Sequence, residues 1–480
     1  MIRRPLTTFL TSSLTSLLLA LAVGASPASA SPSSVPPNFD ATAMHGNEAE
    51  NAIAINPTNP KNIVTMSTLP DVVAGLAVAV TFDGGTTWTR SVIGTGRGDL
   101  GDICCDEQLA WDHFGNLWMV YLHNVNPDTV VALSTDGGLT FSKVASVAPT
   151  TPTGSRSPKN AQYKRLRAGG NHFADQPSIS AGARSVWVSY TSEPSTVIQA
   201  FGWPIRGLEK FGPVSPLQSV PTSTGRGDYG DTAVGSNGQV MVVYQDQSSG
   251  QGGSRIYTAL DPDGLGPAGF GNPRLLARTR VGGFDYIPAQ PDRSVDAEAS
   301  LAWDQSRGPH RGRVYAIWTQ EVINESDNTD IMLQNSDDNG ATWSSARRLN
   351  DDQTRNSQFN PAIALDQTSG AVAVSWYDCR GDGGQGGPRD TDGIRNDDYR
   401  IWATDSTDGG AHFVPNFQVS EGTSNAADAS SFFDTGDYTH AAFQSGLFYP
   451  AWSDNSNSTG TNPDGKLNQL DLFTAKVSIR

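Results

Sequence analysis

The feature of this sequence that most limits its fold is an internal repeat that recurs seven times along the chain. Each copy holds two strand-like segments, in which β-branched and aromatic residues alternate with small or polar ones. The first segments begin near Glu50, Glu107, Asp175, Asp231, Asp296, Phe359 and Asp437. The second segments span Asn62–Ser67, Leu117–Leu122, Ser185–Thr191, Val240–Gln245, Val314–Thr319, Ala371–Tyr377 and Leu447–Ser453. A period of two residues predicts β-strands at all these positions.

A turn motif follows the second segment in four of the repeats. Its copies are Thr81–Trp88, Ser134–Phe141, Ser336–Trp343 and Ser406–Phe413, and Asp261–Gly264 is a candidate remnant of a fifth. In each copy we expect the aspartate to cap backbone N–H groups, a glycine to adopt positive φ and the aromatic residue to pack between sheets. These aspartates therefore have a structural role, not a catalytic one.

Four strands per repeat and seven repeats predict an all-β chain that forms a single β-propeller of four-stranded blades. We expect seven blades, and six if one segment is an insertion. The 50 glycines and 29 prolines suit a chain with many turns and short elements. A helical bundle or a coiled coil is excluded on the same ground.

The four turn motifs resemble the Asp-boxes, or bacterial neuraminidase repeats, of the sialidase superfamily. The resemblance extends over nearly all of the chain after the N-terminal segment, and it implies a propeller fold and a carbohydrate substrate. It does not supply catalytic positions, because no arginine stands between residue 31 and the first turn motif to match the family's carboxylate-binding arginines.

The N-terminus has the features of a secretory signal peptide. Arg3 and Arg4 precede an apolar run at Leu17–Val23, and Ala28–Ala30 has the small-x-small form of a cleavage site. The apolar run is too short to span a bilayer. We therefore expect a signal peptide at residues 1–30, a linker or ring-closing strand at 31–45, and the propeller at 46–480. This organisation predicts a secreted monomer without a membrane span.

The net charge of the chain limits the kinds of partner that it can bind. The formal net charge is −16, whereas a nucleic-acid-binding protein should present a basic surface, so that class is excluded. Between Asp136 and Asp175 there is no acidic residue, and the stretch carries Lys143, Arg156, Lys159, Lys164, Arg165 and Arg167. A basic connection on an acidic protein favours an anionic ligand such as a sialic or uronic acid. The alternative is a solvated loop without a ligand.

Propeller topology indicates where a site should lie. The segments that lead into the inner strands share one face with the exits of the second strands, and ligands usually bind at that mouth of the central channel. We expect the catalytic residues to be Asp106, Glu107, Asp175, Tyr229, Asp231, Asp437 and Tyr438. Substrate-binding residues should be Arg97, His172, Arg226, Glu298, Asp378 and Arg380. Carboxyl groups, tyrosines and arginines around one mouth are what glycoside chemistry needs.

The alternative for each of these aspartates is a loop cap or a calcium ligand. We predict no metal-ligating residues and no required cofactor, although a structural calcium ion is compatible with this composition. Three functions follow from the same residues. The first is a glycoside hydrolase of exo-sialidase type acting on acidic extracellular glycans, the second a polysaccharide lyase, and the third a non-catalytic propeller that binds glycans or proteins.

Cysteine usage is sparse, so disulfides cannot provide the framework of the fold. Cys104 and Cys105 are adjacent and lie between Asp102 and Asp106, and Cys379 is the third cysteine. Two pairings are open, because the neighbours can form a vicinal disulfide or one of them can pair with Cys379. A vicinal ring beside carboxylates would offer a rigid platform for a sugar ring.

Overall fold

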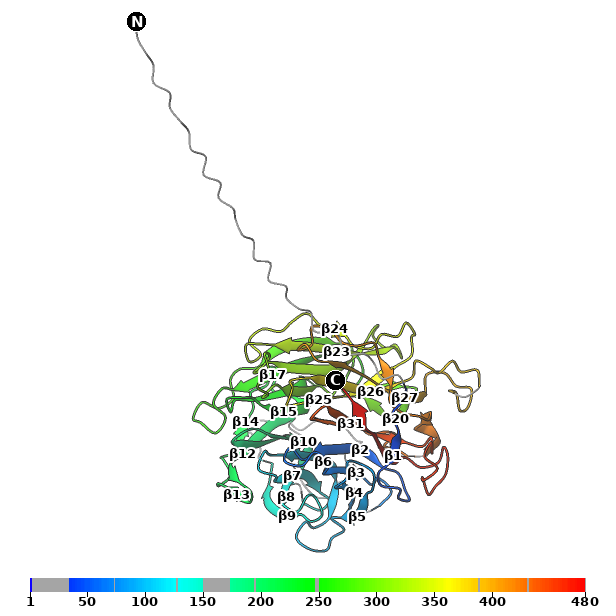
Figure 1. Ribbon diagram of the computed structural model, residues 1–480, viewed down its shortest axis with the longest axis horizontal. Helices are drawn as coiled ribbons and strands as arrows, with labels where there is room; N and C mark the ends of the chain where they lie inside the picture. Colours follow the sequence, from blue (N-terminus) through cyan, green and yellow to red (C-terminus); the bar gives the residue numbers. More distant parts are fainter. Residues whose placement is uncertain are drawn as a thin grey trace.

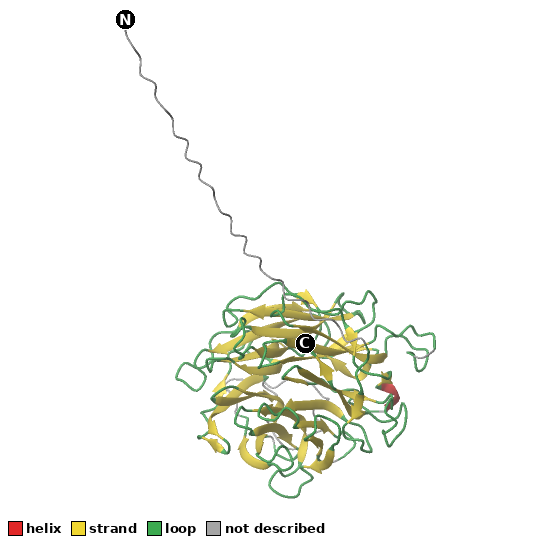
Figure 2. Ribbon diagram, in the orientation of Figure 1, coloured by secondary structure: helices red, strands yellow, loops and turns green. Residues whose placement is uncertain are grey.

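The computed structural model of the chain describes Met1 and residues 34–72, 74–126, 128–149, 173–193, 196–246, 250–386, 389–429 and 431–479. Nearly all regular structure in these ranges is β-strand, arranged in sheets around a common axis (Figures 1 and 2). The described helix is one short 3-10 turn, η2 (Ala427–Ala429). Within the described ranges no helix is long and apolar enough to cross a membrane. The predicted signal peptide falls outside them, apart from Met1.

Seven antiparallel sheets form the blades, which confirms the all-β, seven-bladed propeller. Blade 1 holds β2 (Ala49–Ile55), β3 (Ile63–Thr68), β4 (Leu76–Thr81) and β5 (Thr89–Ile93), and blade 2 holds β6 (Ile103–Trp111), β7 (Leu117–His123), β8 (Thr129–Ser134) and β9 (Ser142–Val147). Blade 3 holds β10 (Phe173–Ala181), β11 (Ser185–Glu193), β12 (Val197–Gly207), β13 (Lys210–Phe211) and β14 (Gln218–Ser219), and blade 4 holds β15 (Asp228–Val234), β16 (Val240–Asp246), β17 (Ser254–Asp261) and β18 (Arg274–Thr279). Blade 5 holds β21 (Ser300–Trp303), β22 (Val314–Glu321), β23 (Thr329–Ser336) and β24 (Arg347–Arg348). Blade 6 holds β25 (Gln358–Leu365), β26 (Val372–Asp378), β27 (Asp398–Ser406), β28 (Phe417–Gln418) and β29 (Ser424–Asn425), and blade 7 holds β30 (Ala441–Gln444), β31 (Leu447–Asp454), β32 (Asp471–Ala475), β33 (Val477–Ser478) and β1 (Asn38–Asp40).

The ring is closed by pairing the two ends of the chain. Strand β1 pairs antiparallel with β32, with Asn38 opposite Ala475 and Asp40 opposite Phe473. The segment expected to be a linker or a ring-closing strand therefore supplies the outer strand of blade 7. Because the first strand of the chain belongs to the last blade, separating β1 from β32 would leave both strands with an unpaired edge. The pairing of the two chain ends therefore stabilises the closed ring.

Two inner strands begin later than the repeat predicts. Paired strand starts at Ser300 in blade 5 and at Ala441 in blade 7, whereas the pattern placed these beginnings near Asp296 and Asp437. The reason is local backbone geometry, since φ is 33° at Glu298 and 88° at Gly436. A positive φ interrupts the extended conformation, so regular pairing starts only after it.

Large aromatic side chains from the second strands fill the spaces between blades. Trp118, Trp187, Trp318, Trp376 and Trp452 are all fully buried and come from the second strands of blades 2, 3, 5, 6 and 7. In two of them the indole N–H donates to an aspartate two residues further on, Trp376 to Asp378 at 2.7 Å and Trp452 to Asp454 at 2.8 Å. A buried N–H group needs such a partner, so these strand-end aspartates stabilise the core.

The four turn motifs form the hydrogen bonds that their sequence predicts. In the first, Asp83 Oδ1 accepts from the N–H of Thr87 at 2.9 Å, and Thr81 Oγ accepts from the N–H of Gly85 at 3.1 Å. Equivalent bonds recur at Asp136, Asp338 and Asp408. The turns join the third and fourth strands, and therefore lie at the opposite end of the blades from the segments that lead into the inner strands.

An additional hairpin lies between blades 4 and 5. It consists of β19 (Asp285–Ile287) and β20 (Gln290–Val295), which pair only with each other among the described strands. The repeat pattern does not predict it. Its hydrogen bonds reach the segment that precedes β30, so the hairpin lies against the start of blade 7.

Candidate active site at one mouth of the channel

Bulges at equivalent positions turn polar side chains of the inner strands toward the channel. The strand register shifts between Ala49 and Ala52, and the same kind of shift occurs in β6, β10, β15 and β25. A non-glycine residue with positive φ stands at the irregularity in four blades, namely Glu50 (59°), Asp106 (57°), Gln176 (42°) and Asn360 (44°), and Glu298 (33°) stands just before the inner strand of blade 5. Bulges of this kind commonly redirect side chains next to functional sites.

Hydrogen bonds show that these side chains meet across the ring. Arg293 forms ion pairs with Asp437, through a short contact, and with Glu50 at 3.5 Å. Gln176 then connects two further blades, because its Nε2 donates to Asp437 at 3.2 Å and its backbone N–H donates to Asp106 at 3.0 Å. We call the set Glu50, Asp106, Glu107, Gln176, Arg293, Asp296, Glu298, Asp437 and Tyr438 the acidic mouth.

The β19–β20 hairpin places Arg293 in this cluster. One carboxylate oxygen of Asp434 accepts from the N–H groups of Asp292 at 2.9 Å and Arg293 at 2.8 Å. The guanidinium also lies 5.0 Å from the ring centroid of Phe433, within range of a cation–π contact. With its side chain 28% exposed, Arg293 connects the buried acids to the surface.

Burial and neighbouring charges raise the pKa of several carboxyl groups of the acidic mouth. Burial raises the pKa of Glu50 and of Glu107 well above the usual range, and the charge of Asp106 adds to the effect in both. Burial likewise raises the pKa of Tyr438, again with Asp106 as a neighbour. Charge is costly to bury, so protonation is the expected response of acids this crowded.

Asp296 and Glu298 form a pair of carboxyl groups that share a hydrogen bond. Burial raises the pKa of both well above normal, and the Asp296 charge further raises that of Glu298. The charge of Asp437 raises both as well, which places the pair beside the Arg293–Asp437 ion pair. Two neighbouring carboxyls that share one proton provide a donor and an acceptor at the same place.

Six polar atoms of this region have no hydrogen-bond partner among the described residues. They are Glu50 Oε2, Glu107 Oε1, Gln176 Oε1, Glu298 Oε2, Asn360 Oδ1 and the Tyr438 hydroxyl. Buried polar groups in folded proteins are nearly always paired, so a concentration of such atoms marks a place where a ligand can supply the missing bonds.

The structure joins Cys104 and Cys105 by a disulfide and leaves Cys379 as a buried free thiol. Of the two pairings that the sequence left open, the vicinal one is therefore present. The ring directly precedes Asp106 and Glu107, and the register of β6 shifts on both sides of Cys105. The disulfide thus constrains the backbone from which two acids of the mouth project.

Deeper in the channel lies a cavity of about 150 Å³ whose lining includes Asp231 and His440. His440 was not among the predicted site residues, although it lies two residues after Tyr438. Its Nδ1 lies 3.0 Å from the carbonyl oxygen of Asn51 and must donate to it, so the neutral ring presents Nε2 as an acceptor. Burial lowers the pKa of His440, which favours that neutral form.

The opposite mouth of the channel is wider and chemically different. A cavity of about 450 Å³ is lined there by the ends of the inner strands, including Trp111, Trp303 and several alanines. Its titratable lining residues are Asp112 and His113. This end shares its face with the four turn motifs, and it has no group of interacting acids comparable with the acidic mouth among the described residues.

The structure brings together five of the predicted site residues and separates others. Asp106, Glu107, Glu298, Asp437 and Tyr438 belong to the acidic mouth. Asp231 lines the deeper cavity, and Asp175 lies near Glu193, whose pKa is raised to about 9 by burial and by the charges of Asp228 and Asp175. Arg97 and Arg226 are exposed on loops, Tyr229 lies on β15 with its side chain outside the described set, and His172 is outside the described residues.

Asp378 and Arg380, which were predicted to bind substrate, contact other side chains of blade 6. Asp378 accepts from the indole of Trp376 and pairs with Arg380 at 2.8 Å. The Arg380 guanidinium lies 4.1 Å from the ring centroid of Trp402 and also donates to Asp351 at 2.8 Å. These contacts point toward the outer strands of the blade. A strand-end position on the correct face did not determine the direction of the side chain.

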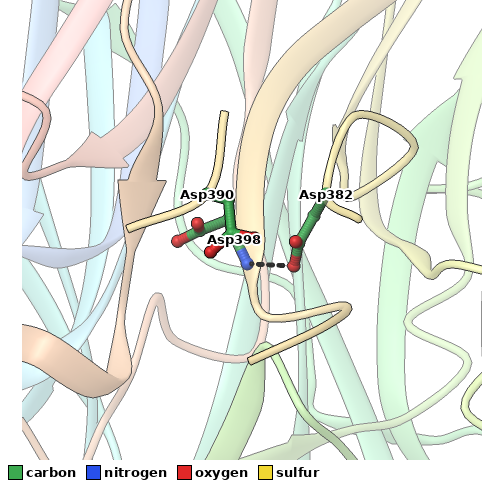
Figure 3. A group of neighbouring side chains, drawn as sticks. All are labelled: Asp382, Asp390 and Asp398. Carbon is green, nitrogen blue, oxygen red and sulfur yellow. Dashed lines mark hydrogen bonds between the residues drawn. The ribbon is translucent and has the colours of Figure 1, made fainter. Parts of the chain in front are cut away.

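The basic stretch between blades 2 and 3 lies outside the described residues, except for Lys143. A possible metal site lies elsewhere, in the loop between β26 and β27, where Asp382, Asp390 and Asp398 approach one another (Figure 3). In the described part of the chain, this is the one group of metal-ligating side chains whose oxygens are close enough to share an ion.

Comparison with known proteins finds only remote similarity to solved structures. No family model matches the sequence, and a search of curated proteins finds no match. Among solved structures, the α-L-arabinanase of Penicillium chrysogenum has a TM-score of 0.45 at 14% identity, over 78% of this chain and 96% of that one. The Trypanosoma rangeli sialidase has a TM-score of 0.41 at 11% identity, over 77% and 54%. The polysaccharide lyase Uly1 has a TM-score of 0.47 at 10% identity, over 92% and 91%. Such low values leave the function to be argued from this chain's own residues.

Proposed function

We propose that this protein is a secreted enzyme that hydrolyses glycosidic bonds in acidic extracellular glycans, and that the reaction takes place at the acidic mouth. One observation carries the proposal. Asp437 forms an ion pair with Arg293, and beside it burial and the charge of Asp296 raise the pKa of Glu298 well above its usual range. Glycosidic cleavage by acid catalysis needs one carboxyl group with a raised pKa to donate a proton and a second carboxyl group beside it to act on the sugar.

The roles follow from these states. Glu298 is the general acid that protonates the leaving oxygen, and Asp437 stabilises the positive charge that develops on the sugar or attacks it. Tyr438, next to Asp437 and unpaired through its hydroxyl among the described residues, lies where it can act as the nucleophile or orient the sugar. Asp296 is a positioning residue, since it reaches the sugar only through Glu298.

An anionic substrate is the second part of the proposal. Arg293 is the guanidinium of the acidic mouth and is partly exposed, so an incoming sugar carboxylate would meet it first. The raised pKa values of Glu50, Glu107 and Glu298 favour their neutral forms, which would repel a substrate anion less than carboxylates would. Export and a monomeric state rest on the sequence alone.

A polysaccharide lyase is the second candidate, and His440 is the observation that favours it. A neutral imidazole with a free Nε2 can remove the proton next to a uronate carboxylate, and the ring of Tyr438 lies 5.3 Å from that of His440. A tyrosine beside such a base can return the proton to the leaving oxygen. The hydrolase and the lyase share the acidic mouth and differ in which residue starts the reaction.

The experiment is incubation of the purified protein with a panel of sialylated and uronate-containing oligosaccharides. Reducing ends and the absorbance of an unsaturated uronate are read on the same samples. Reducing ends alone support the hydrolase, both signals support the lyase, and binding without either signal supports a non-catalytic propeller. Glu298→Gln should abolish the hydrolase signal, whereas Glu421→Gln, the same change at an exposed residue, should leave it intact.

A further inference from the structure

The cavity at the opposite mouth of the channel has no part in the proposed reaction. It measures about 450 Å³, and all seven inner strands contribute to its lining. Most of the lining side chains are apolar, with Trp111, Trp303 and Phe443 among them. This volume lies within the range of pockets that hold small organic ligands. The cavity therefore has the size and the lining of a binding site for a molecule with an apolar body.

A ring of aliphatic side chains lies between this cavity and the smaller one that contains His440. The residues that line both are Ile53, Leu109, Ile179, Leu301 and Ile363. Asp231 and His440 line the smaller cavity but not the wide one. A molecule in the wide cavity would thus be surrounded by apolar groups and would not contact the acidic mouth.

On the side of blades 4, 5 and 6, the polar groups at the rim of the wide cavity are already paired. Gln305 Nε2 donates to the carbonyl oxygen of Val234 at 2.8 Å, and the N–H of Gln305 donates to Gln367 Oε1 at 2.9 Å. Gln367 Nε2 in turn donates to the carbonyl oxygen of Trp303 at 3.0 Å. These amides complete the rim and leave the opposite side, at blades 2 and 3, to meet a polar ligand group.

A basic pocket adjoins the wide cavity on the side of blades 2 and 3. Arg184 and Arg206 line this pocket together with His113, which also lines the wide cavity. The two arginines are close in the fold, because the N–H of Ile205 donates to the carbonyl oxygen of Arg184 at 2.8 Å. Both are exposed, and neither forms an ion pair within the part of the chain that the structure describes. On a chain of net charge −16, two such guanidinium groups favour an anionic ligand.

The neighbouring acid does not compete for these arginines. Among the described residues that line either pocket, Asp112 is the one acid, and it is only 1% exposed. Its Oδ1 accepts from the N–H of Phe114 at 2.9 Å, and its Oδ2 accepts from the indole of Trp118 at 3.0 Å. The buried polar side-chain atom of the wide cavity that lacks a partner among the described residues is a donor, Trp111 Nε1. This side of the cavity therefore offers donors and positive charge to a ligand that brings an acceptor.

We propose that the opposite mouth binds a small amphipathic carboxylate, such as a straight-chain fatty acid. Its anionic head would pair with Arg184 and Arg206, because a guanidinium group matches a carboxylate through two parallel hydrogen bonds. Its apolar body would lie in the wide cavity, where each methylene group is removed from water. The residues involved are separate from the acidic mouth, so this site stands or fails independently of the proposed reaction.

The test is calorimetric titration of the full-length protein with octanoate, decanoate and dodecanoate, each below the concentration at which it forms micelles. We expect one ligand per chain and an affinity that rises about two- to fourfold for each added methylene group until the cavity is full. Decan-1-ol, which lacks the charge, should bind at least about tenfold more weakly than decanoate. An absence of binding heat with all three acids, or an affinity that does not depend on chain length, would overturn the proposal.

Variants locate the ligand. Arg184→Gln and Arg206→Gln should each weaken dodecanoate binding by about tenfold, and Trp111→Phe, which keeps an aromatic ring but loses the N–H, by about threefold. Arg278→Gln is the matched control, an exposed arginine on β18 outside both pockets, and should change the affinity by less than about twofold. An unchanged affinity in the double variant of Arg184 and Arg206 would contradict the site. Sedimentation adds a further check, because a dimer that takes up no dodecanoate and dissociates in Arg184→Gln would assign this face to a second copy of the chain instead.

Discussion

In the turns between third and fourth strands, the carboxylates of Asp83 and Asp338 are exposed, whereas at the acidic mouth Glu50 and Glu107 are fully buried. Hydrogen bonds from Thr87 and Thr342 lower the pKa of the two turn aspartates to about 2. Burial raises the pKa of the two glutamates well above the usual range. The same functional group is thus kept charged at one end of the blades and neutral at the other.

The difference has a physical basis that separates structure from function. A turn aspartate gains stability by accepting N–H bonds in the charged form, and water screens it from other charges. A channel carboxyl loses water, has few donors to compensate and has other acids as neighbours, so it keeps its proton. Groups of the second kind are unfavourable for folding, and they persist where chemistry uses them.

The largest effect that would test this contrast is expected from Glu298→Gln. The amide keeps the shape and a hydrogen-bond donor toward Asp296 but cannot transfer a proton, so kcat should fall by about 100-fold or more. Tm should change little, because the native carboxyl is already neutral. Steady-state kinetics and thermal melting measure both. Full activity in this variant would remove Glu298 from the reaction.

The second test uses the dependence of stability on pH. Burial and neighbouring acids raise the pKa of Glu193 to about 9, and burial raises that of Glu48 to about 8, from a normal value of 4.5. The folded state holds these protons more tightly than the unfolded state, so stability should decline as the pH rises from 4.5 toward 9. Asp83 and Asp338 act in the opposite direction, since stability is lost as the pH falls from 3.8 to about 2.

The buried glutamates lose stability above pH 4.5 and the turn aspartates lose it below pH 3.8, so Tm should be highest near pH 4–5 and decrease toward alkaline pH. Calorimetry in the presence of EDTA measures this without a contribution from metal binding. Glu193→Gln should flatten the alkaline decline, while Glu421→Gln should leave it unchanged. A Tm that rises steadily between about pH 5 and pH 8 would contradict the protonated state of the buried acids.

A smaller effect is expected from the vicinal disulfide. Closing a ring between adjacent residues removes little freedom from the unfolded chain, so the double change Cys104→Ser and Cys105→Ser should lower Tm only slightly. It releases the backbone before Asp106 and Glu107, and should reduce kcat/KM by about tenfold. Mapping of peptides under non-reducing conditions checks the bond itself. A peptide linking Cys379 to either neighbour would show that the pairing is wrong.

The smallest effect concerns the other end of the blades. Asp136→Ala removes the acceptor for the N–H groups of Leu139 and Thr140 and should cost about 1 kcal/mol of unfolding free energy, with kcat unchanged. Denaturant unfolding and kinetics on the same sample measure it. Lost activity at an unchanged stability would mean that the two faces of the propeller have been interchanged.

The fold could be predicted from the sequence because it consists of repeated blades, and each repeat leaves a recognisable pattern of residues. The alternation of residues placed the second strands to within two residues, as for Val240–Gln245 against the observed Val240–Asp246 and Ser185–Thr191 against the observed Ser185–Glu193. The turn motifs depend on local hydrogen bonds, so their geometry also follows from their residues. The delayed starts of β21 and β30 and the additional β19–β20 hairpin departed from the pattern, because neither backbone bulges nor an inserted hairpin leaves a periodic signal.

The site was predictable only in part, since it depends on contacts between distant blades. Asp106, Glu107 and Asp437 were predicted site residues because they lie near the starts of inner strands, and the structure places all three in the acidic mouth. Arg293 comes from a hairpin outside the repeat and meets Asp437 across 144 residues of chain, which no local pattern encodes. Asp378 and Arg380 form contacts with Trp376, Trp402 and Asp351 that the sequence did not predict, because a sequence position fixes the face of the ring but not the direction of a side chain.

The measurement that tests the central claim most directly is a crystal structure of Glu298→Gln with the oligosaccharide that the wild type cleaves or binds. The account predicts the sugar at the acidic mouth, in contact with Asp437 and Tyr438 and with its carboxylate near Arg293. A sugar bound instead in the cavity at the opposite mouth, beside Trp111 and Trp303, would contradict it.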